Sequence, residues 1–247
     1  MDSIYKIAAH CRSDIGLRRK RNEDICAVCT KFQYFLVADG IGGALAGDIA
    51  SSLFLNAVSE TLTFTGKITP EESCEKIKTC FQNANKRIQQ HVSENPAHKG
   101  MGCTAELLII CDDEFILGHI GDSRTYSFCN NILERLTEDH TLIREQLNLG
   151  IISEQQAKMS AFNNILLRAV GVEPQVEFDI HRGKIAPGTL FVLCTDGLYN
   201  MVPEHEMLPV LKYNAPLALK TEMLIDMANN AGGADNITVT LVEVAGK

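Results

Sequence analysis

The chain has 247 residues, of which 45% are hydrophobic, and a formal net charge of −8. A chain of this size can bury one large core, so we expect a single domain over residues 1–247. Its acidic surface would repel nucleic-acid phosphates and anionic membranes, so we expect neither as a partner. We see no apolar run of about 18 residues and no signal peptide, and therefore expect a cytoplasmic protein. No feature specifies an oligomer, so we expect a monomer.

In chain order, strands are predicted first at 4–10, 25–29 and 33–38, followed by helices at 46–62 and 71–92. Three strands follow at 105–111, 115–120 and 124–128, and their close spacing indicates hairpins with antiparallel pairing. The pattern then predicts a helix at 141–148, strands at 176–181 and 189–195, a helix at 216–230 and a strand at 237–244.

The strands at 35–38 and 190–194 are apolar on both faces, which is typical of strands inside a layered structure. Two consecutive helices precede a run of strands, so the order is not a βαβ alternation. This order favours an α+β sandwich with helices outside the sheets.

Four aspartates stand at the ends of predicted strands, three of them directly beside a glycine. Asp39, Asp122 and Asp196 follow apolar strands, and Asp235 follows two glycines and precedes the last strand. One such Asp-Gly pair is most simply a turn. Four converging carboxylates would repel one another unless a cation neutralised them, and oxygen ligands of this kind suit Mg²⁺ or Mn²⁺.

The segment from Ser13 to Asp24 contains a run of basic residues, Arg18 to Arg21, followed by acids. An arginine fork matches the oxygens of a phosphate group. The same run is also compatible with a solvated basic loop or a nuclear-localisation signal.

Two cysteine patterns offer alternative functional sites, one for a metal ion and one for cysteine-dependent catalysis. Cys26 and Cys29 have metal-ligand spacing, but no second such pair follows, and the nine cysteines of the chain do not indicate a disulfide framework. Cys129 and Arg135 have the C-x5-R spacing of cysteine-dependent phosphatases. No glycine lies between them to form a phosphate-binding turn, and Glu134 would stand beside the anion.

Taken together, these segments resemble the metal-dependent protein phosphatases of type 2C, in their short bacterial form. The resemblance spans about residues 10 to 244, and the matching motifs occur in the family's order: Ser13–Asp24, Ala38–Gly43, Ala46–Ser51, Met101–Thr104, Gly121–Arg124, Leu136–His140, Asn164–Gly171, Thr195–Gly197 and Gly233–Thr238. It implies a four-layer α-β-β-α sandwich of two antiparallel sheets flanked by helices. It also implies hydrolysis of phosphoserine and phosphothreonine, with phosphorylated proteins as partners.

The resemblance assigns roles to individual residues. It implies two core ions, Mn²⁺ or Mg²⁺, and a weaker third ion. Asp39 would bridge the two core ions, the Gly40 carbonyl would ligate one of them, Asp196 and Asp235 would ligate the other, and Asp122 with Asp196 would hold the third. Arg19 would bind the substrate phosphate, Glu23 and Asp24 would order metal-bound waters, and Asn236 would support the site. A water bridging the two ions would attack phosphorus without a covalent intermediate.

The match fails where the family places a histidine that would protonate the leaving group. The chain has Ala44 and Ile41 at the two positions concerned, and we expect structural roles for His119 and His140. A metal-bound water could serve instead, so we expect slower turnover of alkyl than of aryl phosphates. The flap beside the active site, at about 141–163, lacks the family's His-Pro within its last residues. The alternative function is a weak or inactive phosphatase-like module that binds phosphoproteins.

Overall fold

The structure is a computed structural model that describes residues 5–63, 68–160 and 165–246. Two five-stranded antiparallel sheets form its centre. The first has the strand order β1 (Tyr5–Asp14), β12 (Ile237–Gly246), β11 (Thr189–Cys194), β8 (Arg124–Cys129), β9 (Ile132–Arg135). The second has the order β10 (Asp179–Lys184), β7 (Glu114–Ile120), β6 (Ala105–Cys111), β3 (Tyr34–Ala38), β2 (Ile25–Cys29). A short pair, β4 (Gly40–Ile41) and β5 (Gly102–Cys103), lies beside them.

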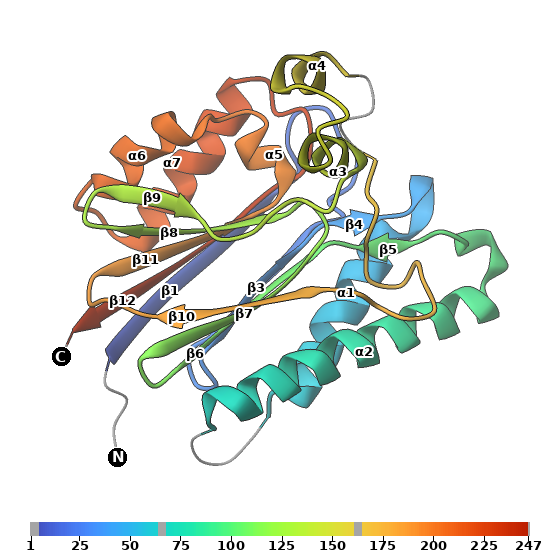
Figure 1. Cartoon of the computed structure of the whole chain (residues 1–247), viewed down its shortest axis with the longest axis horizontal. Coiled ribbons are helices and arrows are strands. Elements are labelled where there is room, and N and C mark those ends of the chain that lie inside the picture. The colour runs from blue at the N-terminus through green and yellow to red at the C-terminus, as the bar shows by residue number, and fades with distance from the viewer. Residues whose placement is uncertain (1–4, 64–67, 161–164, 247) are drawn as a thin grey trace.

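The two sheets pack face to face, and helices cover their outer faces (Figure 1). Helices α1 (Gly43–Thr61) and α2 (Pro70–Glu94), with the short 3-10 helix η1 (Pro96–His98), lie on the side of the second sheet. Helices α5 (Asp196–Tyr199), α6 (Glu204–Lys212) and α7 (Leu217–Asn230) lie on the side of the first. The predicted α-β-β-α sandwich of antiparallel sheets is therefore confirmed.

The predicted apolar strands are buried on both faces because each contributes to two cores. In β3, Phe35 and Val37 belong to the core between the sheets, whereas Leu36 and Ala38 pack in the core beneath α1 and α2. Strand β11 alternates in the same way between the central core and the core beneath α6 and α7. Side chains that point alternately to opposite faces explain why neither strand shows a polar face.

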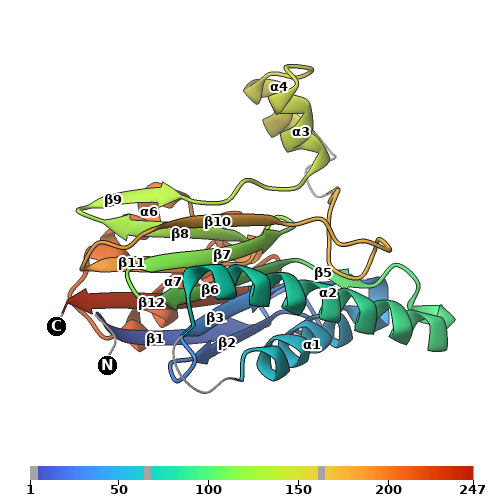
Figure 2. The same ribbon diagram turned by 60° about the horizontal axis from the view of Figure 1, so that its bottom comes forward.

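Helices α3 (Leu142–Asn148) and α4 (Glu154–Met159) project from the sandwich (Figure 2). They form most of the predicted flap, of which residues 161–163 lie outside the described part. No helix in the described ranges combines the length and apolarity that crossing a membrane would need.

One predicted pairing is wrong. Strands at 115–120 and 124–128 were expected to form a hairpin, but β7 lies in the second sheet and β8 lies in the first, paired with β11 and β9. Gly121 adopts φ +100°, a conformation open mainly to glycine, and here the chain passes from one sheet to the other. Three intervening residues therefore make a crossing between layers and not a turn.

Other differences concern short elements. Strand β10 begins at Asp179, later than the predicted 176, and the short elements β4, β5, β9, α4, α5 and α6 were not predicted. Most of them span fewer than two full periods of any hydrophobic pattern, so the sequence carries little signal for them.

Candidate active site

All four predicted aspartates line one cavity of about 600 Å³ at the end of the sandwich where the two sheets meet. Asp39 and Asp122 follow strands of the second sheet, while Asp196 follows and Asp235 precedes strands of the first. The cavity is lined by Arg19, Lys20, Arg21, Glu23, Asp39, Gly40, Ile41, Gly42, Thr104, Asp122, Leu166, Asp196, Asp235 and Asn236. Asp24, which was also predicted to belong to the site, does not line the cavity. Its side chain is buried close by.

Asp39 is held by Thr104, which follows β5. The Asp39 N–H donates to Thr104 Oγ1 at 3.0 Å, and the Thr104 N–H donates to the Asp39 carbonyl at 2.9 Å. The Thr104 hydroxyl is in turn hydrogen-bonded to Ser123 Oγ at 2.7 Å. Thr104 and Ser123 are both fully buried, so this pairing links the ends of two strands and leaves Asp39 little freedom.

Gly40 is required by close packing. A Cβ on Gly40 would lie 2.2 Å from the carbonyl oxygen of Gly47, a distance that no real side chain tolerates. The Gly40 N–H donates to the Glu23 carbonyl at 3.1 Å, which brings the N-terminal segment beside β4. The absence of a side chain here keeps the backbone at the cavity accessible.

Asp196 begins helix α5, and its two carboxylate oxygens differ. Oδ2 accepts a hydrogen bond from Asn200 Nδ2 at 3.1 Å, whereas Oδ1 is buried and has no hydrogen-bond partner in the described part of the chain. The preceding residue, Thr195, donates its hydroxyl to Asp24 Oδ2 at 2.8 Å. The Oδ1 atom of Asp24 is likewise buried without a partner among the described residues.

Several aspartates in and beside the cavity have raised pKa values. Burial raises the pKa of Asp24 and of Asp122 to about 7 and that of Asp196 to about 6, and neighbouring carboxylates add to each rise. Asp39, which is surrounded by the other aspartates, has a pKa well above the usual value for the same two reasons. Such a group of acids is poorly tolerated as free anions, and a divalent cation would relieve its repulsion.

Arg19 reaches the cavity from the N-terminal loop. Its guanidinium donates to Asp235 Oδ2 at 2.6 Å, and half of the side chain is exposed to solvent. The hydrogen bond to Asp235 is the largest cause of the raised pKa of Arg19. The sequence placed Arg19 on the substrate and Asp235 on a metal ion, and the structure brings these two residues into contact, although they lie 216 positions apart.

Asn236 ties the same loop to the rest of the site. Its side-chain amide donates to the Arg21 carbonyl at 2.9 Å, and its Oδ1 accepts from the Glu23 N–H at 2.8 Å. The Leu17 N–H also donates to the Gly233 carbonyl at 2.8 Å. The predicted supporting residue therefore acts as a tether between the N-terminal loop and the segment before β12.

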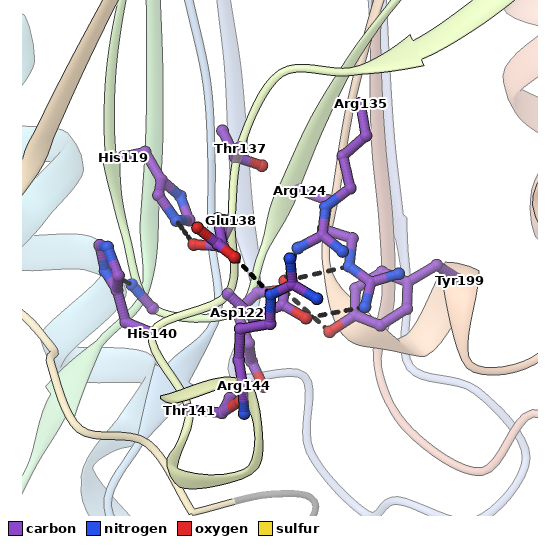
Figure 3. Close-up of polar contacts among 12 residues, drawn as sticks. His119, Asp122, Arg124, Arg135, Thr137, Glu138, His140, Thr141, Arg144 and Tyr199 are labelled. Carbon is purple, nitrogen blue, oxygen red and sulfur yellow. Dashed lines mark hydrogen bonds and ion pairs between the residues drawn. The ribbon is translucent and has the colours of Figure 1, made fainter. Parts of the chain in front are cut away.

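Asp122 lines both this cavity and a smaller one of about 290 Å³ beside the flap. Figure 3 shows Asp122 with its neighbours Arg124 and Tyr199. The Tyr199 hydroxyl donates to the Asp122 carbonyl at 2.8 Å, and the Arg124 guanidinium lies 3.5 Å from the centre of the Tyr199 ring. Arg124 also forms a two-pronged ion pair with Asp139, at 3.0 and 2.8 Å, and Arg135 binds the same carboxylate. This network fixes the backbone at Asp122.

His140 lies at the base of the flap and is committed to structural bonds. The backbone N–H of His140 donates to the Gly121 carbonyl at 2.8 Å, and the ring Nδ1 accepts from the Gly121 N–H at 3.2 Å. Burial lowers the pKa of His140 to about 4, so the ring is neutral at pH 7 and Nε2 can donate to Asp179 at 3.2 Å. His119 is fully buried and bonds to Glu106. It also bonds to the Glu138 carbonyl (Figure 3).

Neither histidine lines the cavity, in keeping with the structural roles expected from the sequence. Ile41 does line it. Ala44 falls within α1, but its side chain lies outside the described part.

The described residues contain no group of three His, Cys, Asp or Glu side chains already arranged to hold a metal ion. Asp235 is instead engaged by Arg19. The donor set nevertheless suits a hard cation, because it includes the Asp39, Asp122 and Asp196 carboxylates, whose pKa values are raised, and an Asp196 oxygen that is buried without a partner among the described residues. The individual metal-ligand assignments therefore stay predictions.

Thr104, Ser123 and Thr195 lie within motifs found in the sequence, but no role was predicted for them. Tyr199 was missed altogether. Their position next to the motif aspartates was the available signal. Their bonding partners, however, lie on strands and loops distant in the chain, which no local pattern reveals.

Comparison with known proteins defines the class of this chain. A family model described as protein phosphatase 2C matches residues 17–230. The chain belongs to this family, which confirms the resemblance found in the sequence, and it is a protein-serine/threonine phosphatase.

Among the relatives is the serine/threonine phosphatase stp of Listeria innocua, which is 39% identical over 239 residues, 95% of either chain. The serine/threonine phosphatase of S. agalactiae superposes with a TM-score of 0.91 at 31% identity, over 96% of this chain and 99% of that one. The catalytic domain of PstP, solved in complex with 2 manganese ions, gives a TM-score of 0.86 at 29% identity, over 97% and 98%.

Proposed function

We propose that this protein hydrolyses phosphoserine and phosphothreonine in phosphorylated proteins and that the reaction depends on two Mn²⁺ or Mg²⁺ ions. One observation carries the proposal: four aspartates from the ends of both sheets line a single cavity, and burial raises the pKa values of three of them. The two manganese ions in the related PstP structure support the same kind of cofactor.

Asp39, the Gly40 carbonyl, Asp196 and Asp235 are the residues that would hold the two core ions, and Asp122 with Asp196 would hold a weaker third. Bound divalent ions would supply Lewis acidity that lowers the pKa of a water molecule, so that hydroxide could act as the nucleophile without a covalent intermediate.

Arg19 has the reach and the charge to bind the phosphate that enters the cavity. It donates to Asp235 in this structure, and the N–H groups of the same guanidinium would bind the phosphate oxygens. Glu23 lines the cavity and can order water there. Asp24 lies beneath and accepts from Thr195, so it would act on the neighbouring Asp196 through the backbone.

The leaving alkoxide needs a proton, and no histidine side chain of the described residues lines the cavity. Water within the site would supply this proton. Aryl phosphates have better leaving groups than phosphoserine or phosphothreonine and depend less on protonation. We therefore expect faster turnover of aryl phosphates than of alkyl phosphates.

The test measures hydrolysis of an aryl phosphate and of a phosphothreonine peptide, with Mn²⁺ and with a chelator. Both reactions should require the metal, and Asp39→Asn or Asp196→Asn should lower kcat/KM about a hundredfold or more. Undiminished turnover in the chelator would rule out the metal-dependent reaction. Binding of the peptide without any turnover would favour the alternative of a phosphoprotein-binding module.

A further inference from the structure

A basic rim borders one side of the candidate active site. It consists of Lys20 and Arg21, which are exposed and line the same cavity as the aspartates. The neighbouring Arg19 is paired with Asp235, inside the cavity. Within the described ranges, neither Lys20 nor Arg21 has a carboxylate partner. The proposed reaction uses Arg19 and leaves these two cations without a role.

The rim is held in place by the backbone that carries it. The Arg21 carbonyl accepts from the Asn236 amide at 2.9 Å, and the Arg18 N–H donates to the Gly233 carbonyl at 3.2 Å. On the far side of the rim, Asn22 Nδ2 donates to Ser13 Oγ at 2.7 Å. Bonds on both sides of Lys20 and Arg21 hold the backbone that carries their side chains beside the cavity.

The charge of the rim is opposite to that of its surroundings. The chain carries a formal net charge of −8, so acidic groups outnumber basic ones over the molecule as a whole. A peptide with acidic residues would be repelled by most of this surface. Lys20 and Arg21 have no carboxylate partner in the described part of the chain, so their positive charge beside the cavity is available to residues that flank a phosphorylated side chain.

We propose that Lys20 and Arg21 bind acidic side chains that flank the phosphorylated residue, so that the protein prefers phosphothreonine and phosphoserine in an acidic sequence context. This specificity rests on the proposed phosphatase function. The contacts lie at the surface, where each ion pair contributes modestly and is screened by salt. Their effect is therefore expected mainly in KM.

The experiment compares two phosphothreonine peptides of equal length in the presence of Mn²⁺. One carries Asp and Glu on both sides of the phosphothreonine, and the other carries Asn and Gln at the same positions. The readout is the ratio of kcat/KM for the acidic peptide to that for the neutral peptide. We expect a ratio of about ten at about 0.1 M salt and a value near one at about 1 M salt, where the Debye length has fallen to about 3 Å.

Two double variants test the residues. Lys20→Gln with Arg21→Gln should bring the ratio to about one. Lys86→Gln with Lys212→Gln removes the same two charges from exposed positions on α2 and α6 and should leave the ratio as it is. Lys20→Glu with Arg21→Glu should invert the preference. Thermal unfolding shows that each variant is folded.

Equal turnover of both peptides by the native protein, or an unchanged ratio in the folded Lys20→Gln, Arg21→Gln protein, would overturn the inference and leave the phosphatase function standing. An equal loss of the ratio in the α2 and α6 variant would also overturn it, because the preference would then reflect net charge alone. Absence of metal-dependent turnover of either peptide would overturn the proposed function and this inference with it.

Discussion

At the scale of single residues, the position of Asp39 depends on a threonine hydroxyl. Thr104 Oγ1 accepts a hydrogen bond from the Asp39 N–H and also bonds to Ser123, the residue after Asp122. One hydroxyl thus connects the positions of two candidate ligands, Asp39 and Asp122. Groups that orient metal ligands commonly affect metal affinity or activity as much as 10- to 100-fold.

Thr104→Val should therefore lower both stability and activity. The buried Asp39 N–H would lose its acceptor, which costs about 1–3 kcal/mol in the free energy of unfolding, and kcat/KM should fall about tenfold. Urea unfolding and phosphatase assays measure the two effects, and Thr104→Ser should restore them. Thr240→Val is the matched control, because the Thr240 hydroxyl donates to the Leu36 carbonyl within the sandwich, away from the cavity. It should lower stability and leave kcat/KM alone; a normal kcat/KM in Thr104→Val would contradict the assigned role.

At the scale of elements, the flap is attached through its base. The Leu142 N–H donates to the Ile165 carbonyl at 2.9 Å, and the Leu167 N–H donates to the His140 carbonyl at 2.8 Å. His140 bonds to Gly121, the residue before Asp122, through both its backbone N–H and its ring Nδ1. The orientation of α3 and α4 is thus connected to the candidate third-metal position.

His140→Ala should loosen this base without removing a proton donor. We expect a KM for the phosphothreonine peptide that is raised several-fold, while kcat changes little for aryl and alkyl phosphates alike. Steady-state kinetics on both substrate types measure this. A selective collapse of kcat for the alkyl phosphate would mean that His140 protonates the leaving group, despite a pKa lowered to about 4 by burial.

At the scale of the whole molecule, neighbouring acids in and beside the cavity repel one another when no metal is bound. Burial raises the pKa of Asp24 and Asp122 to about 7 and that of Asp196 to about 6, whereas aspartate in an unfolded chain has a pKa of about 3.9. Between about pH 4 and pH 7 the folded state consequently binds more protons than the unfolded state. The stability that these groups contribute is present at low pH and is lost as pH rises through their folded pKa values.

Thermal unfolding of the chelator-treated protein should accordingly show a lower midpoint at pH 8 than at pH 5. Added Mn²⁺ should raise the midpoint most at pH 8, because the cation takes the place of the lost protons. At 100 times its Kd the metal would add about 2.7 kcal/mol to the free energy of unfolding. A metal-free midpoint that climbs from pH 5 to pH 8 would contradict this linkage.

Much of the fold and of the site could be predicted because it depends on the types of residues that are neighbours in the sequence. Phe35 to Ala38 are all apolar, which marks a strand covered on both faces, and aspartates beside glycines mark the ends of such strands. The ordered motifs led to the family, and the comparisons confirmed it. These features survive any detail of packing because they depend on neighbours within a few positions.

The tertiary structure alone decided which distant parts meet. It carried the chain across the two sheets at Gly121, where spacing had predicted a hairpin, and it brought Arg19 onto Asp235. It also placed Lys20 and Arg21 at the mouth of the cavity, where a basic run of unknown purpose became a rim beside the candidate metal ligands. Contacts of this kind result from how whole layers pack, so no sequence window contains them, whereas the aspartates themselves could be read directly from the chain.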